Sequence, residues 1–182
     1  MAPKVLCILA DGVEEIEVVA PVDILRRAGV EVVMVSPDAR EQGEVVGKTG
    51  IRIGVDAALS EVGFREFDAL LVPGGPAISA LREKGEIASL ARTFQQNGKV
   101  VAGICAAPLL LKDAGLLDGR RHTAHYTTYN ELGDAERGQR VIVDGSLVTS
   151  QGAGTAVEFG LALAGLLAGE DVAREVADSI MA

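Results

Sequence analysis

Short runs of apolar residues alternate along the chain with longer segments in which apolar positions recur every three to four residues. The short runs cover residues 5–10, 30–35, 69–72 and 100–104. Continuous apolar runs of this length are typical of strands that are buried on both faces of a parallel sheet. The first longer segment ends at Ala28-Gly29 and another, near 87–96, ends at Asn97-Gly98, where glycine favours a helix terminus. The alternation predicts strands connected by helices.

The second half of the chain predicts a hairpin followed by two helices. Residues 140–149 contain Asp144-Gly145, a pair that favours a tight turn between antiparallel strands, so we expect the sheet to be mixed at one edge. Helices are expected near 154–168 and 171–181. No linker or repeat divides the sequence. The prediction is a doubly wound α/β fold, with a mostly parallel sheet between helices, in a single domain spanning residues 1–182.

Charge and composition restrict the partners. The 182 residues include 26 acidic and 17 basic side chains, which gives a net charge of −9 and a pI near 4.7. This negative field repels phosphate backbones and anionic lipid surfaces, which argues against nucleic-acid and membrane partners. Aromatic residues make up 3% of the chain and tryptophan is absent, so surfaces for stacking sugars, bases or flavins are poorly supplied.

The location expected from the sequence is a reducing cytoplasm. The apolar stretch at 159–168 is about half as long as the roughly 20 residues of a membrane span. The apolar run near the amino end is too short for a typical export signal. Two cysteines cannot build a disulfide framework.

Cys105 is the first candidate for chemistry, because ligands of such folds bind beyond the carboxyl ends of the strands. It follows the run at 100–104 and precedes a helix expected to begin near Ala107, with Pro108 suited to a first helical position. The helix amino end favours a thiolate and lowers the pKa of a cysteine there. An inert buried cysteine would occupy the same position. Cys7 lies within an apolar run and is predicted to be a core residue.

The second candidate is Glu17. When residues are placed at intervals of about 100° around the first helix, Glu14 and Glu17 fall on its apolar face, while Glu15 falls on the polar face. A carboxylate that faces a core is costly unless it is hydrogen-bonded, paired or protonated, and a raised pKa is one outcome. Glu14 lies in the first turn, where it can satisfy the helix terminus. Pro21 can kink the helix and alter these directions.

Backbone N–H groups near the cysteine suggest an oxyanion site. Gly74 and Gly75 permit backbone conformations closed to other residues, and the N–H groups of Gly75 and Ala106 could together hold the oxygen of a carbonyl attacked by Cys105. A plain turn at the end of a strand is the alternative. A second glycine loop, 152–154, resembles part of a phosphate-binding loop but follows a hairpin strand and lacks the full motif.

His122 and His125 are the only histidines. They lie three positions apart without further nearby ligands, so the sequence does not predict a metal site. An ordinary structural role is the default for each. A cysteine nucleophile needs a base, however, and histidine titrates closest to neutral pH, so one of these two is the candidate.

Several segments together resemble the ThiJ/PfpI family, in the branch that contains the parkinsonism-associated protein deglycase. In order and spacing, the segments that carry this resemblance are 8–17 (ILADGVEEIE), 21–29 (PVDILRRAG), 72–75 (VPGG), 104–108 (ICAAP) and 149–156 (TSQGAGTA). The match covers almost the whole chain. The branch has an arginine at the position of Thr49 and a proline at that of Tyr126, so an anion contact from a partner subunit and the loop after the histidine are expected to differ here.

The resemblance implies a flavodoxin-like sandwich with Cys105 on a strained elbow and Glu17 hydrogen-bonded to its sulfur. It also implies an oxyanion site at Gly75 and Ala106, and a histidine near the cysteine at His125. Family members of this kind are typically homodimers in which the first helix contributes to the interface, and they use no cofactor.

The implied activity is a glutathione-independent, glyoxalase III-type or deglycase-like reaction that converts small 2-oxoaldehydes, such as methylglyoxal to lactate, in protection against carbonyl stress. One alternative is a sensor of oxidative stress, or a protective chaperone, that works through oxidation of Cys105. A cysteine peptidase is the weaker alternative.

Overall fold

A seven-stranded sheet forms the centre of the structure, a computed structural model that describes residues 2–38 and 43–182. In spatial order its strands are β5 (Ala57–Ala58), β2 (Glu31–Ser36), β1 (Lys4–Ile8), β6 (Ala69–Val72), β7 (Val100–Ile104), β9 (Leu147–Ser150) and β8 (Val141–Asp144). Neighbouring strands are parallel except β8, which pairs antiparallel with β9 at the edge. The mixed sheet predicted from the sequence is confirmed.

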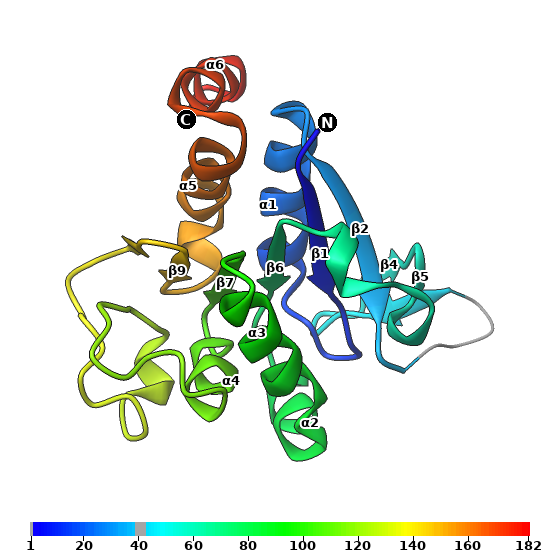
Figure 1. The fold of residues 1–182 in the computed structure, drawn as a ribbon, viewed down its shortest axis with the longest axis vertical. Coiled ribbons are helices and arrows are strands. Elements are labelled where there is room, and N and C mark those ends of the chain that lie inside the picture. Colours follow the sequence, from blue (N-terminus) through cyan, green and yellow to red (C-terminus); the bar gives the residue numbers. More distant parts are fainter. Residues whose placement is uncertain (1, 39–42) are drawn as a thin grey trace.

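Helices cover both faces of this sheet (Figure 1). One face carries α1 (Glu15–Arg27), α5 (Ala156–Ala168) and α6 (Glu170–Ile180), and the other carries α2 (Ala77–Lys84), α3 (Glu86–Gln96) and α4 (Pro108–Asp113). This arrangement is the predicted flavodoxin-like sandwich. Helix α1 ends at Arg27 with Ala28 as its cap, and Gly29 follows with a φ of 77°, close to the end expected at Ala28-Gly29.

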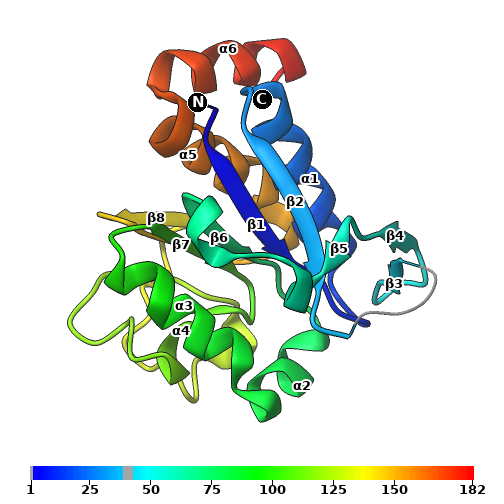
Figure 2. The same ribbon diagram turned by 45° about the vertical axis from the view of Figure 1, so that its right-hand side comes forward.

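Several short elements escaped the sequence pattern. Helix α2 has only eight residues, and a separate hairpin is formed by β3 (Glu44–Val46) and β4 (Arg52–Gly54), three residues each. Elements this short contain too few periods for hydrophobic spacing to reveal them. The hairpin projects beside the carboxyl end of β1 (Figure 2), where its turn reaches the start of α1.

The turn between β8 and β9 lies one residue later than the Asp-Gly pair suggests. Asp144 pairs with Leu147, so the two central residues are Gly145 and Ser146. Gly145 has a φ of 59°, which glycine adopts without strain. The predicted hairpin is therefore confirmed, with its register shifted by one residue.

Helix α1 packs closely against α5. Pro21 lies inside α1, yet the helix continues from Glu15 to Arg27. Gly160 of α5 provides the space, because a Cβ atom there would lie 3.0 Å from the Cα atom of Pro21 and 2.9 Å from Cδ1 of Ile24.

Among residues 2–38 and 43–182, no helix combines the length and apolar character that crossing a membrane requires.

Candidate functional site

Three loops converge at the carboxyl ends of β1, β6 and β7, which are neighbours in the sheet. The loop after β1 leads into α1 and positions Glu17, the loop after β6 contains Gly74 and Gly75, and β7 ends next to Cys105. A backbone hydrogen bond from the N–H of Glu14 to the carbonyl oxygen of Gly74 (3.1 Å) connects the first two loops. The topology therefore gathers residues that are far apart in the sequence, as expected for this class of fold.

Cys105 has a backbone conformation that is rare for a residue with a side chain. Its φ is 65°, in the left-handed region. Its N–H donates to the carbonyl oxygen of Ser150 (2.9 Å), and its own carbonyl oxygen accepts from the N–H of His125 (2.9 Å). These two bonds hold a conformation that costs of order 1–3 kcal/mol and that is found most often at functional sites.

Glu17 is buried below the cysteine. Glu17 is only 1% exposed. Its Oε2 atom accepts a hydrogen bond from the N–H of Gly74 (2.8 Å). A Cβ atom on Gly74 would lie 2.6 Å from Cβ of Cys105 and 2.7 Å from Oε2 of Glu17. Glycine at position 74 is therefore required for the cysteine and the glutamate to meet.

The sulfur of Cys105 has three hydrogen-bond partners. They are the Glu17 side chain and the N–H groups of Gly75 and Ala106. Gly75 has a φ of 98°, and a Cβ atom at this position would lie 2.6 Å from the backbone nitrogen of Glu14. The structure thus brings together the five residues that the sequence suggests for a nucleophile and an oxyanion site: Cys105, Glu17, Gly74, Gly75 and Ala106.

Burial and mutual charge change the titration of the pair. Burial raises the pKa of Glu17 to about 7, although the N–H of Gly74 acts in the opposite direction. Burial, followed by the charge and hydrogen bond of Glu17, raises the pKa of Cys105 to about 12, against the lowering effect of the Gly75 and Ala106 N–H groups. Burial and the Glu17 carboxylate thus act on this thiol in the direction opposite to the lowering expected from the helix amino end. Helix α4 has only six residues, and burial beside a carboxylate outweighs its dipole.

A pocket of about 660 Å³ opens above the sulfur, with Glu14, Lys48, His125 and Tyr126 in its wall. Nδ1 of His125 lies 2.8 Å from Oγ1 of Thr127, which engages this nitrogen away from the sulfur. Burial, and then the charge of Lys48, lowers the pKa of His125, so its ring is neutral near pH 7. Its position in the wall allows contact with a ligand, while Glu17 is the side chain that touches the sulfur.

Two site features were missed by the sequence pattern. The turn after β3 places Nζ of Lys48 3.1 Å from Oε2 of Glu14, so Glu14 binds a lysine instead of satisfying the helix terminus as expected. Glu15, expected on the polar face, is buried because the same turn covers it. Its carboxylate accepts 2.7 Å hydrogen bonds from both the N–H and the hydroxyl of Thr49. The sequence feature that could have indicated this turn is the Gly-Lys-Thr-Gly segment at residues 47–50, which lies between two short apolar runs.

The remaining candidates lie away from the sulfur. Cys7 is fully buried in the core, as predicted, and burial raises its pKa to about 12. His122 is 1% exposed, and its Nδ1 lies 3.0 Å from the carbonyl oxygen of Arg120. Within the part of the chain that the structure describes, no three histidine, cysteine or acidic side chains gather in a way that could hold a metal ion.

The chain is similar to known proteins in sequence and in fold. The model of the DJ-1/PfpI family matches residues 3–166. Protein dj-1beta of Drosophila melanogaster is 34% identical over 100% of this chain and 98% of its own length, and its crystal structure superimposes with a TM-score of 0.91. A deglycase of Thermococcus kodakarensis is 36% identical, covering 81% of this chain and 89% of its own. A glutathione-independent glyoxalase of Caenorhabditis elegans is 34% identical, covering 88% and 86%.

Proposed function

Because the chain belongs to the DJ-1/PfpI family, we propose that it is an enzyme that converts small 2-oxoaldehydes to 2-hydroxy acids, methylglyoxal to lactate, with Cys105 as nucleophile. The reaction uses neither glutathione nor a bound cofactor. One observation carries the proposal: the sulfur of Cys105 faces an open pocket while Glu17 and two backbone N–H groups contact it. The relatives named deglycase and glyoxalase support the class of substrate.

The nucleophile forms when one proton moves from the sulfur to Glu17. The carboxylate charge, which is among the causes that raise the pKa of Cys105, disappears in this transfer, and the new O–H of Glu17 donates to the thiolate. Glu17 is suited to accept the proton because burial has already raised its pKa to about 7. The pair therefore supplies a thiolate without a net change of its charge.

The thiolate attacks the aldehyde carbon of methylglyoxal, and a carbon–sulfur bond replaces the carbonyl π bond. The N–H groups of Gly75 and Ala106, which lie beside the sulfur, stabilise the oxygen that becomes negative. Protonation of this oxygen gives a hemithioacetal. The two amides thus act first on the thiolate and then on the adduct.

The later steps transfer protons and consume one water molecule. A base, either the Glu17 carboxylate or the neutral His125 ring, removes the proton on the former aldehyde carbon, and the neighbouring carbon is protonated. The resulting thioester reacts with water to release lactate and restore the thiol. The aldehyde carbon is oxidised by two electrons and the ketone carbon is reduced by two, so no external redox partner is needed.

The test is to incubate purified protein with methylglyoxal and measure lactate by NMR without glutathione. We expect Cys105→Ser to reduce kcat by at least about 100-fold, because near pH 7 a serine hydroxyl is a far weaker nucleophile than a cysteine thiolate. Cys7→Ser is the matched control, because this thiol is in the core and away from the pocket. Equal turnover by Cys105→Ser and wild type would exclude Cys105 as the nucleophile.

A second candidate function is oxidation sensing through the same thiol. Cys105 is a free, half-buried cysteine, and its N–H partners would also stabilise a sulfinate. Mass spectrometry after mild peroxide treatment distinguishes the two functions: oxygen added at Cys105 but not at Cys7, together with negligible aldehyde turnover, favours sensing. Cleavage of casein would instead indicate a peptidase.

We also propose that the chain forms a homodimer through α1. Ile16 and Val19 on this helix and Ile51 beside it are each more than half exposed, and together they line a mainly apolar depression. Exposed apolar residues that are contiguous in this way are typical of protein interfaces.

A further inference from the structure

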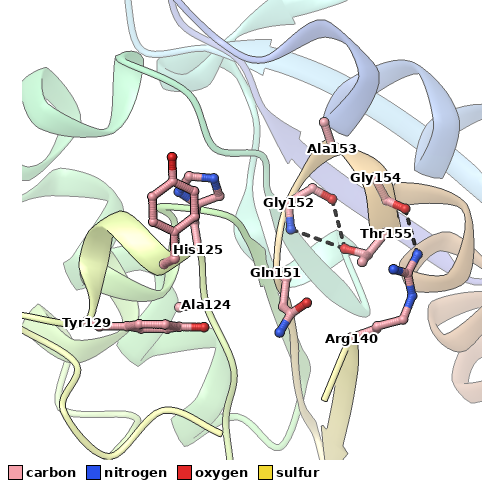
Figure 3. Close-up of a pocket in the computed structure, with 10 residues that line it drawn as sticks. Ala124, His125, Tyr129, Arg140, Gln151, Gly152, Ala153, Gly154 and Thr155 are labelled. Carbon is pink, nitrogen blue, oxygen red and sulfur yellow. Dashed lines mark hydrogen bonds between the residues drawn. The ribbon is translucent and has the colours of Figure 1, made fainter. Parts of the chain in front are cut away.

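A second pocket of about 510 Å³ adjoins the one above Cys105. His125, Tyr126 and Ala153 line both pockets, so the two share a wall. Figure 3 shows the second pocket between the segment with His125 and Tyr129 on one side and, on the other, the segment with Gln151 and Gly152 together with Arg140.

Aromatic side chains are concentrated at this pocket. The chain has two tyrosines and four phenylalanines, and both tyrosines line it. Three phenylalanines are fully buried, and Phe64 packs against the core. Tyr126 is 71% exposed, and its ring centroid lies 4.3 Å from that of His125. Both tyrosines of the chain therefore lie at this one site, where Tyr129 also packs against the core.

The opposite wall offers no free charge. The guanidinium of Arg140 donates to the carboxylate of Glu158 (2.9 Å) and to the carbonyl oxygen of Gly154 (2.7 Å). The N–H of Gly152 donates to the hydroxyl of Thr155 (3.1 Å), so this glycine loop does not present that donor to a phosphate. A phosphate or carboxylate would have to displace these partners. The guanidinium of Arg137 lies 4.8 Å from the ring centroid of Tyr129 and occupies one face of that ring, so a neutral group would pack against the other face.

We propose that this second pocket binds a flat, uncharged substituent of the substrate, so that the protein prefers aryl 2-oxoaldehydes to methylglyoxal. The inference rests on the proposed function for the site of reaction and adds the substituent specificity. The aldehyde lies over Cys105 and the ring lies in the second pocket against Tyr126 and Tyr129. Both are specificity-determining residues, since each lines the space that a ring but not a methyl group fills.

Binding of product analogues tests this without turnover. In the Cys105→Ser variant, NMR titration compares mandelate with lactate, two 2-hydroxy acids that differ only in carrying a phenyl or a methyl group. We expect mandelate to bind about ten-fold more tightly, in line with the usual energy of an aromatic pair. Hexahydromandelate, apolar and similar in size but not flat, should bind with intermediate affinity.

Variants at Tyr129 provide the second measurement. Tyr129→Leu should bring the mandelate-to-lactate affinity ratio close to one, while Tyr129→Phe, which keeps the ring, should restore it. Val143→Ala, an exposed position on β8, is the control and should keep the ratio. A ratio near one in Cys105→Ser, or an undiminished ratio in Tyr129→Leu, overturns the proposal.

Turnover by the wild-type protein separates this proposal from the proposed function. If mandelate binds ten-fold more tightly than lactate but the wild-type protein converts no oxoaldehyde, the proposed role of the second pocket is supported and the proposed reaction is refuted. Conversion of methylglyoxal together with a ratio near one supports the reaction and refutes the pocket.

Discussion

In the proposed mechanism, Glu17 and Cys105 exchange a proton, and Glu17 is almost completely buried. The buried carboxyl is fixed by the N–H of Gly74, and the sulfur is fixed by two further N–H groups. Each of these contacts favours the ionised form of the group it touches, whereas burial favours the neutral form. We therefore expect the pair to hold one negative charge in total once the pH has risen through the raised pKa of Glu17.

The reactivity of Cys105 should follow this shared charge. Because the pKa of Glu17 is raised from 4.5 to about 7, both groups hold their protons below pH 7 and the pair loses one as the pH rises through 7. Alkylation by iodoacetamide should therefore increase through an inflection near pH 7, well below the ordinary thiol value. In Glu17→Gln the carboxyl proton is absent, so the inflection near pH 7 should vanish.

Glu14→Gln is the matched control for this profile. Its charge is one of the causes that raise the pKa of Glu17, so its removal should keep the inflection and move it to lower pH. An inflection near pH 7 that survives in Glu17→Gln would show that another group controls the thiol.

At the scale of elements, α1, which carries Glu17, packs against α5. Gly160→Ala would place a Cβ atom within 3.0 Å of the Pro21 backbone, and overpacking of this kind typically costs 1–3 kcal/mol. The higher helix propensity of alanine offsets up to about 1 kcal/mol. We expect a net loss of about 1–2 kcal/mol in the free energy of unfolding, measured with urea.

Gly165→Ala in the same helix separates packing from propensity. Its Cβ atom would meet only the end of the flexible Glu170 side chain, which can move aside. This variant should be about 0.5–1 kcal/mol more stable than wild type. Equal effects of the two substitutions would argue against a tight contact between α1 and α5.

The long elements and the location of the site could be predicted from the sequence, because continuous apolar runs and glycine stops specify buried strands and helix ends. The burial of Glu17 follows from its place on the apolar face of α1. Lys48 and Glu15 could not be found this way. Their positions depend on where a short hairpin folds over α1, and three-residue strands leave no periodic signal.

For the whole molecule, the exposed apolar surface of α1 predicts self-association. Wild-type protein should have twice the 18.9 kDa chain mass in light scattering, while Val19→Asp, which places a charge in the apolar patch, should yield monomers. Val143→Asp is the control, since this residue is also exposed but lies on β8. A wild-type mass of one chain would refute the dimer.

The sign of the thiol's pKa shift could not be predicted from the sequence. A cysteine before a helix suggests a lowered pKa, but the outcome depends on the depth of the sulfur and on the carboxylate beside it. Both depend on the packing of three loops that are distant in the chain. The chemistry of Cys105 is thus a property of the assembled fold.

The crowding around Gly74 has a consequence for how the proposed enzyme can diversify. A Cβ atom on Gly74 would collide with both Cys105 and Glu17. Any single substitution of Gly74 would therefore disturb the other two residues, and selection for activity would remove it. Tyr126, largely exposed on the outer wall, is under no such restriction. Laboratory evolution toward new aldehydes should therefore accumulate its changes along that outer wall and leave the inner triad of Gly74, Glu17 and Cys105 intact.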